Sequence, residues 1–374
     1  MKGLVDSTLR EGAQSVGVHF NRAEKIRIIE LLVKIGIEEI ELGLASDKAE
    51  IADLLASCRN TENETRFAIW CRCRADDVRA ATELRPDVLS LSVPSSDLHL
   101  ERRLHRNRQW AIDSLRAAIE QARAANLPYI SVGLEDASRA DPKFLAELAD
   151  TATTAGADRL RLADTVGTCN PTRIQEMVSH LREQTHLAIG IHAHNDFGMA
   201  TANTITALTA GADWGDVSIL GLGERAGMAK LEEVAGFLSL HNHHRSYRVE
   251  LLKAACKIVS DATQRIIQPH HPIIGEAIFT CETGLHLQGL LREPSTYEPF
   301  DPQLVGSKRQ LLFGTKIGQG AVEGLLANHQ QSATPLMLQK ITSAIREHAK
   351  NKQRPLTAGE IISPSASENA AKDY

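Results

Sequence analysis

The chain has 374 residues, which is long enough for one domain of about 250 residues and a smaller second one. Its net charge of −5, without a long basic run, argues against a nucleic-acid-binding surface, and no apolar stretch approaches the roughly 20 residues that cross a membrane. The start of the chain enters a strand-like run without a signal peptide, and its six cysteines do not form a disulfide framework, so we expect a protein of the cytoplasm.

Short β-type runs alternate with amphipathic helical stretches up to residue 240. The expected strands are residues 3–6, 37–42, 66–71, 87–93, 128–134, 158–163, 187–193 and 214–220. The expected helices are residues 21–35, 47–60, 75–84, 107–126, 141–155, 170–184, 198–210 and 229–240. Eight strand–helix units in about 240 residues predict an α/β fold, the TIM (β/α)8 barrel. The alternative, a doubly wound open sheet, would usually have a glycine-rich turn after its first strand, which this chain lacks.

The pattern changes after the last of these helices. A helix is expected over residues 247–266, followed by short strand and turn pieces and a helix over 334–348. We therefore expect a barrel domain at 1–245 and a C-terminal subdomain, a small α+β extension, at 246–349. Residues 350–374 are rich in Ser, Ala, Pro and charge and are expected to form a flexible tail.

Polar side chains gather at the ends of most expected strands, the rim at which TIM barrels carry their chemistry. His192 and His194 end the seventh strand, and residues two apart in a strand point to the same face. Asp6 ends the first strand, which only the eighth separates from the seventh in a closed barrel. Two imidazoles and a carboxylate with open positions are typical of a catalytic metal site. Arg10 could neutralise an oxygen that becomes negatively charged, although an internal ion pair with Asp6 is the alternative.

Three motifs resemble the signatures of the DRE-TIM metallolyase superfamily, which contains the homocitrate, isopropylmalate and citramalate synthases and the hydroxymethylglutaryl-CoA lyases. They are Asp-Ser-Thr-Leu-Arg-Glu-Gly (6–12), Gly-Ile-His-Ala-His-Asn-Asp-Phe-Gly (190–198) and Gly-Leu-Gly-Glu-Arg-Ala-Gly (221–227). Four others are similar to those of the nitrogen-fixation-type homocitrate synthases, namely residues 92–99, 135–141, 163–167 and 289–302. The resemblance covers about residues 3–325 and depends on several long motifs in the right order.

The resemblance implies a Claisen-type condensation. Acetyl-CoA would lose a methyl proton, its enolate would attack the ketone of a 2-oxo acid held on a divalent metal, and the thioester would be hydrolysed. With 2-oxoglutarate the product would be homocitrate, and the metal would be Mg, Mn or Zn. Asp6, His192 and His194 would be the metal ligands. The expected partners are these small-molecule substrates and a second copy of the chain, in a homodimer whose segment around 281–300 crosses to the neighbouring barrel.

The same resemblance assigns roles to further residues. Arg10 would stabilise the ketone oxygen, supported by Glu11 and Gln14, and Arg139 would pair with the distal carboxylate of 2-oxoglutarate, for which a planar guanidinium is suited. The candidate catalytic residues are Arg10, Glu135, Cys281, His286 and Tyr297. The candidate substrate-binding residues are Arg10, Gln14, Glu41, Arg139 and Thr165.

Three departures from the family pattern keep other functions open. Cys281 replaces a histidine implicated in proton transfer, Met228 replaces the asparagine of isopropylmalate synthases, and residues 314–318 replace the usual Gly-Lys-His-Ser-Gly. A cysteine is a base only when the pKa of its thiol is lowered. The alternatives are a synthase for another 2-oxo acid, of the citramalate or isopropylmalate type, a metal-dependent lyase or aldolase, and a non-catalytic barrel that binds a ligand. The lyase is disfavoured because residues 221–228 lack its usual loop cysteine.

Overall fold

Eight parallel strands form a closed barrel in sequence order, so the prediction of a TIM barrel is confirmed. This computed structural model describes residues 1–59, 64–242 and 247–362. The strands are β1 Gly3–Asp6, β2 Glu39–Leu44, β3 Arg66–Arg72, β4 Val88–Pro94, β5 Ile130–Glu135, β6 Arg159–Asp164, β7 Ala188–Ala193 and β8 Trp214–Val217. The barrel closes where β1 pairs with β8, opposite β1's pairing with β2. β8 ends before the expected residue 220 because the chain turns into a 3-10 helix at Ile219–Gly221.

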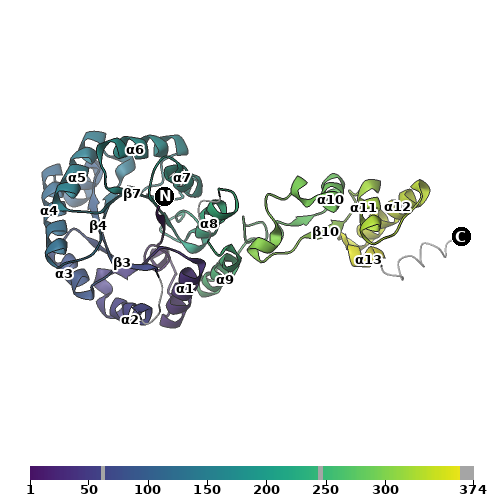
Figure 1. The fold of residues 1–374 in the computed structure, drawn as a ribbon, viewed down its shortest axis with the longest axis horizontal. Helices are drawn as coiled ribbons and strands as arrows, with labels where there is room; N and C mark the ends of the chain where they lie inside the picture. The colour runs from purple at the N-terminus through teal and green to yellow at the C-terminus, as the bar shows by residue number, and fades with distance from the viewer. Residues whose placement is uncertain (60–63, 243–246, 363–374) are drawn as a thin grey trace. The chain divides into compact units, whose positions relative to one another are not determined.

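A ring of helices surrounds the strands (Figure 1). They are α1 Arg22–Ile35, α2 Lys48–Arg59, α3 Ala75–Leu84, α4 Arg108–Ala124, α5 Pro142–Ala155, α6 Pro171–Gln184, α7 Ala200–Thr209, α8 Leu231–Leu240 and α9 Leu252–Thr263. Local sequence sets where they begin and end. The side chain of Asn21 accepts a hydrogen bond from the backbone of Glu24 at the start of α1, and Gly36 ends that helix with a φ of 96°.

Charged side chains fill part of the barrel interior. Glu39 and Glu41 on β2 are fully buried, and they meet Arg159 and Arg161 on β6. Because β2 and β6 are not neighbours in the sheet, these pairs cross the inside of the barrel. Ile40 and Leu42 of β2 and Leu160 and Leu162 of β6, at the alternate positions, are also buried. The strands therefore have one charged face toward the barrel axis and one apolar face.

The remaining chain forms a second compact unit, Gln268–Tyr374, after a first unit of Met1–Ile267. It contains β9 Thr280–Cys281, α10 Gly284–Arg292, β10 Gln310–Phe313, α11 Gln319–Asn328, α12 Pro335–Lys352, β11 Leu356–Thr357 and α13 Ala358–Ile362. The three strands form a sheet in the order β11–β10–β9, which confirms a C-terminal α+β extension. Leu287, Phe313 and Val322 are fully buried in its own core.

The boundary expected between residues 245 and 246 lies outside the described residues, whereas the two units divide after Ile267. Of the expected tail, residues 350–352 end α12 and residues 356–362 form β11 and α13, whereas residues 363–374 lie outside the described residues.

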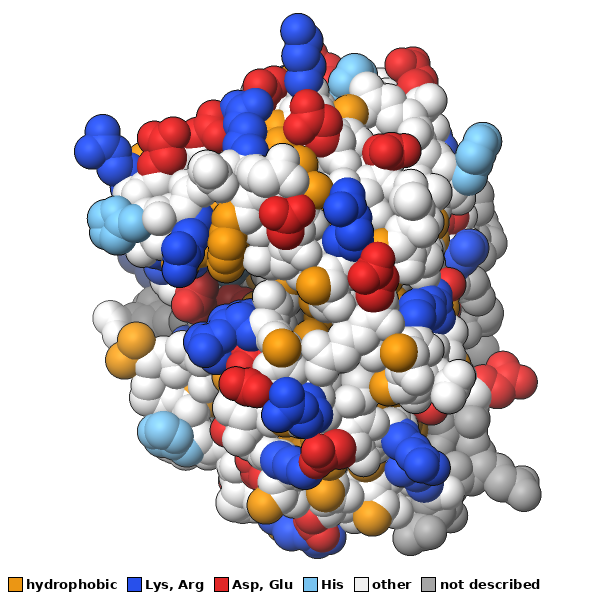
Figure 2. Space-filling view, turned by 90° about the vertical axis from the view of Figure 1, so that its left-hand side faces the viewer, with side chains coloured by type: hydrophobic (Ala, Val, Ile, Leu, Met, Phe, Trp, Pro, Cys, Tyr) orange, Lys and Arg blue, Asp and Glu red, His pale blue; other side chains and the backbone are white. Residues whose placement is uncertain are grey.

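The outer surface of the barrel unit is mixed in charge. In Figure 2 basic and acidic side chains alternate over the visible face, and hydrophobic ones form small separate spots. This distribution is typical of a solvated helix face. Among the described residues, no helix combines the length and apolar character needed to cross a membrane.

Candidate active site

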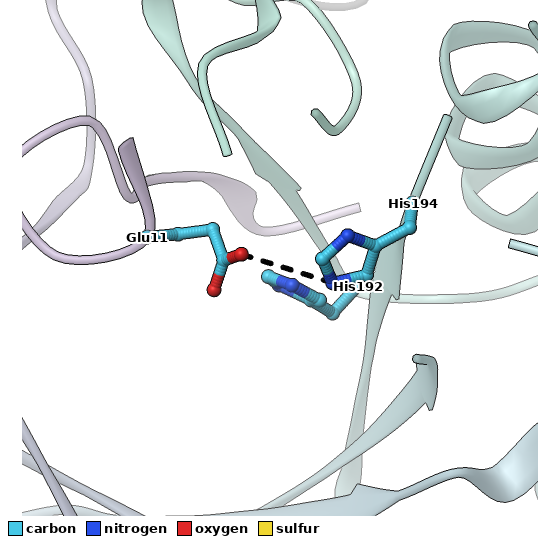
Figure 3. Close-up of side chains that lie close together, drawn as sticks. All are labelled: Glu11, His192 and His194. Carbon is cyan, nitrogen blue, oxygen red and sulfur yellow. Dashed lines mark ion pairs between the residues drawn. The ribbon is translucent and has the colours of Figure 1, made fainter. Parts of the chain in front are cut away.

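Glu11, His192 and His194 lie together at the carboxyl ends of the strands. His192 lies on β7, His194 directly follows that strand, and Glu11 comes from the turn after β1 (Figure 3). One ligand atom from each lies within 4.8 Å of the others, and all three side chains are buried. His194 Nε2 is 3.9 Å from Glu11 Oε1. Two imidazole nitrogens and a carboxylate oxygen are the donor set of a catalytic metal site that keeps positions open for substrate.

The protonation of this group suits a cation. Burial, together with the neighbouring His192, lowers the pKa of His194 to about 4, so its imidazole is neutral at pH 7. Burial alone would raise the pKa of Glu11, but the Arg10 guanidinium and the two histidines lower it to about 2. Among the described residues, His194 Nδ1 is buried without a hydrogen-bond partner. An imidazole left this free is available to a metal ion.

Asp6 occupies a different place from the one expected. Its carboxylate is fully buried, and its two oxygens accept hydrogen bonds from Thr8, one from the backbone N–H at 2.9 Å and one from the hydroxyl at 3.0 Å. Burial raises the pKa of Asp6 to about 7. Thr8 Oγ1 in turn accepts from the backbone N–H of Ile219 at 2.9 Å, which ties β1 to the turn after β8. Asp6 is not in the group of ligand atoms described above, in which Glu11 lies beside the two histidines.

A buried carboxylate fixes the orientation of one histidine. His192 Nδ1 lies 2.8 Å from Asp216 Oδ2, on β8. This contact leaves Nε2 of His192 for a metal, the arrangement in which a carboxylate orients a ligating imidazole. The same Asp216 oxygen accepts from Arg161 Nη1 at 2.9 Å.

Arg161 continues this contact chain across the barrel. Its Nη1 also donates to Glu41 Oε1 at 2.8 Å. Glu41 accepts from Arg10 Nε at 2.7 Å and from the Ser7 hydroxyl at 2.6 Å, and Arg10 pairs with Glu11. Burial alone would raise the pKa of Glu41, but Arg10 and Arg161 hold it well below its usual range. A hydrogen bond from His192 to Asp216 and a series of ion pairs from Asp216 onward thus connect His192 to Glu11.

A pocket of about 750 Å³ opens above this network. Both histidines, Glu11 and Arg10 line it. Its lining includes six arginines and three glutamates, although the whole chain has a net charge of −5. The arginines are Arg10, Arg72, Arg74, Arg103, Arg106 and Arg161. Four of them, Arg10, Arg72, Arg103 and Arg161, pair with protein carboxylates. The described residues show no ion pair for Arg74 or Arg106, whose free charge suits an anionic ligand.

The expected substrate-binding residues divide between the pocket and its surroundings. Gln14 and Thr165 line the pocket, as does the candidate catalytic residue Glu135, which accepts two hydrogen bonds from Arg103, at 2.7 and 2.9 Å. Glu41 lies in the ion-pair network described above.

Arg139 is held outside the pocket lining. Its Nε donates to both carboxylate oxygens of Asp136, at 2.8 and 3.1 Å, and its Nη2 donates to the same carboxylate at 2.9 Å. The edge of the guanidinium that would grip a substrate carboxylate is therefore occupied by a protein carboxylate.

Three candidate catalytic residues lie in the second unit. The rings of His286 and Tyr297 stack with centroids 4.1 Å apart, whereas Cys281 lies on β9. Burial raises the pKa of the Cys281 thiol, and Glu282 adds to this effect. The thiol is therefore less able to act as a base than an exposed cysteine. Met228, which replaces a family asparagine, is buried, and its backbone forms a β-bridge with His194.

Two residues of the site, Arg161 and Asp216, were not among the sequence-based candidates. Both lie within strands rather than after them, in the runs Arg-Leu-Arg-Leu and Trp-Gly-Asp-Val. In β6, Arg159 and Arg161 alternate with leucines, which is the signal of an inward-facing charged layer, whereas Asp216 is the only charged residue of β8 and has no such repeat.

Comparisons with known proteins extend over both units. Residues 3–259 match the family described as HMGL-like, and residues 273–353 match the "Homocitrate synthase post-HMGL domain-like" family. The Bacillus subtilis HMG-CoA lyase structure superimposes with a TM-score of 0.63 at 21% identity, covering 71% of this chain and 95% of that one, which supports the fold.

Relatives with similar coverage have different named products. The 2-isopropylmalate synthase 2 of Caldanaerobacter subterraneus subsp. tengcongensis is 37% identical over 96% of this chain and 94% of its own. The homocitrate synthase of Frankia alni is 40% identical, with 87% and 92% covered. The 2-phosphonomethylmalate synthase of Streptomyces rubellomurinus is 34% identical, with 89% and 88% covered.

Proposed function

The chain belongs to the HMGL-like family, and from this membership we propose that it condenses acetyl-CoA with 2-oxoglutarate to form homocitrate and CoA. The resemblance to the synthases of this superfamily, inferred from the motifs, is confirmed by relatives that share most of the chain. The match of the second unit to a homocitrate synthase domain supports the choice of product.

The charge of the pocket is the observation that favours 2-oxoglutarate. An isopropylmalate synthase must accommodate a branched apolar side chain, for which an apolar wall is suited. This pocket is instead lined by Arg74 and Arg106, for which the described residues show no ion pair, and such free positive charge suits a 2-oxo acid with a second anionic group. A phosphono group would satisfy the same charges, and one relative is named for such a product, so a phosphonate 2-oxo acid is the second candidate.

Glu11, His192 and His194 would hold the divalent metal, since their donor set and the free imidazole of His194 fit it. When bound, such an ion polarises a ketone as a Lewis acid. Asp216 holds the His192 ring in place, and Arg10 lies at the pocket wall, where its charge would stabilise the ketone oxygen as it becomes an alkoxide.

The proposed reaction forms a carbon–carbon bond and then hydrolyses the thioester. The acetyl methyl group loses a proton to a base, the resulting carbon attacks the ketone carbon to form a C–C bond, and the ketone oxygen gains a proton. Water then cleaves the thioester and releases CoA. We propose Glu135, His286 and Tyr297 as candidate proton-transfer groups, with Cys281 weaker because burial raises the pKa of its thiol.

The test is a substrate panel with the purified, metal-supplemented protein. Acetyl-CoA is combined in turn with 2-oxoglutarate, phosphonopyruvate, pyruvate and 2-oxoisovalerate, while CoA release is followed by a thiol reagent and products by mass spectrometry. We expect homocitrate as the main product, and no CoA release from Glu11→Gln. Release with pyruvate or 2-oxoisovalerate alone would assign the chain to the citramalate or isopropylmalate type, and release without any 2-oxo acid would indicate simple thioester hydrolysis.

A further inference from the structure

The two histidines of the candidate metal site are held in place differently (Figure 3). The ring of His192 is fixed by Asp216, whose Oδ2 lies 2.8 Å from Nδ1. Within the described part of the chain, Nδ1 of His194 has no hydrogen-bond partner, and the carboxylate near its Nε2 is that of Glu11, another candidate ligand. A ligating imidazole is usually oriented by a hydrogen bond at its other nitrogen. The position of His194 therefore depends on its backbone.

The backbone of His194 lies against the segment that follows β8. His194 and Met228 form a β-bridge, and the backbone N–H of Asn195 donates to the carbonyl of Gly227 at 2.8 Å. A Cβ on Gly227 would lie 1.9 Å from the carbonyl oxygen of Gly221, so this segment folds back on itself in a way that only glycine permits. Whatever holds the segment after β8 also holds His194.

Arg225 fastens this segment to two other loops. Its Nε and Nη2 donate to the two carboxylate oxygens of Asp196, each at 2.9 Å, and Nη2 also donates to the carbonyl of Thr165 at 2.7 Å. Asp196 lies two positions after His194, and Thr165 follows β6. A bidentate pair fixes direction as well as distance. We call Arg225, Asp196 and Thr165 the rim junction, because they join the loops after β6, β7 and β8.

The backbone around the rim junction is shaped for this contact. Gly167, in the loop after β6, has a φ of 62°, and a Cβ there would lie 2.5 Å from Oδ2 of Asp196. Arg225 itself has a φ of 54°, a conformation that costs energy for a residue other than glycine. The side chains of Arg225 and Asp196 are 41% and 22% exposed, and exposed ion pairs contribute little to stability. These features favour a positioning role over a stabilising one.

We propose that Arg225 is a positioning residue that holds the backbone of His194 through Asp196 and so raises the affinity of the candidate site for a divalent cation. It does for His194 what Asp216 does for His192. Arg225 acts through its neighbours, because a guanidinium has no lone pair to offer a metal. This inference rests on the proposed metal site and extends it to the loops that surround it.

The test is a calorimetric titration with manganese chloride, without either substrate. Arg225→Gln loses the fork and should raise the Kd for Mn²⁺ at least about tenfold, the usual cost of removing a group that orients a ligand. Arg225→Lys should lose less, because its ammonium can still pair with Asp196. Arg22→Gln is the matched control and should keep the wild-type Kd. Arg22 also donates two hydrogen bonds to an aspartate, Asp53, but it joins α1 to α2 and does not line the pocket.

A double variant checks that Arg225 acts through Asp196. Asp196→Asn should weaken Mn²⁺ binding in the same direction, and combining it with Arg225→Gln should add little to the loss from Arg225→Gln. Asp196→Asn also serves as the test if Arg225→Gln does not fold. Losses that add in the double variant would overturn the inference. So would a lower urea midpoint in Arg225→Gln with an unchanged Kd, because Arg225 would then have a structural role only.

Activity measurements separate this inference from the proposed function. Excess Mn²⁺ should restore condensation in Arg225→Gln, which keeps all three candidate ligands, but not in Glu11→Gln. Manganese binding that depends on Arg225, without condensation of any 2-oxo acid, would remove the proposed reaction and keep the inference. Condensation together with an unchanged Kd in Arg225→Gln would remove the inference and keep the reaction.

Discussion

Two carboxylates compete for the role of third metal ligand, and single substitutions separate them. Glu11 has an ionised carboxylate beside the histidines, whereas both oxygens of Asp6 are engaged by Thr8. We expect Glu11→Gln to lose bound metal and Asp6→Asn to keep it, measured as metal per chain after dialysis against limiting chelator. Retention of metal by Glu11→Gln together with its loss from Asp6→Asn would restore Asp6 as the ligand.

Asp6 should also affect how stability depends on pH. Burial raises its pKa from 3.8 to about 7, so between these values the folded chain binds a proton that the unfolded chain does not. The contribution of Asp6 to the free energy of unfolding therefore falls as pH rises from about 4 to 7, by at most about 4 kcal/mol.

Urea unfolding of wild type and Asp6→Asn at pH 4.5 and 7.5 measures this effect. We expect the wild type to lose stability relative to the variant at the higher pH. A difference between the two proteins that stays constant with pH would contradict the prediction.

A buried ion pair joins β2 and β6, which are not neighbours in the barrel. Arg159 and Glu39 are fully buried, and Glu39 also accepts from Arg66 at 2.8 Å. Removing one partner leaves a charge without its compensation, so Arg159→Met should cost about 3 kcal/mol of unfolding free energy. Replacing both, Glu39→Leu with Arg159→Met, should recover most of this loss in urea unfolding. An equal or larger loss in the double variant would mean that packing, not charge, dominates.

The sequence predicts those features of the barrel that depend on local periodicity, but not those that depend on its closure. The strand–helix alternation and the His192–His194 spacing depend on local periodicity, and both can be read directly. Which strand residue faces the axis depends on barrel closure, a long-range property. The inward positions of Arg161 and Asp216 and the choice of Glu11 over Asp6 therefore required the assembled fold. Glu11 lies in the turn after β1, and a turn has no periodicity from which the direction of its side chain can be predicted.

The proposed homodimer makes a prediction for the whole molecule. If the second unit of one chain serves the barrel of its partner, a His192→Ala chain and a His286→Ala chain would complement one another. Co-expressed, they should reach about a quarter of wild-type activity, because half of the dimers are mixed and each mixed dimer has one complete site.

Matched pairs of variants control this experiment. His192→Ala with Glu11→Gln damages the same barrel site in both chains and should give no recovery. Activity that stays absent in the His192→Ala and His286→Ala mixture, with mixed dimers verified by mass spectrometry, would show that His286 serves its own barrel or neither.

The series of hydrogen bonds and ion pairs from His192 through Asp216, Arg161, Glu41 and Arg10 to Glu11 also constrains how such a protein can diverge. Arg161, Glu41 and Arg10 each have two neighbours of opposite sign, so one replacement disturbs both at once. A lineage that shifts toward an apolar substrate must therefore change several of these positions together. Intermediates with a single change would carry an imbalance that the protein interior tolerates poorly.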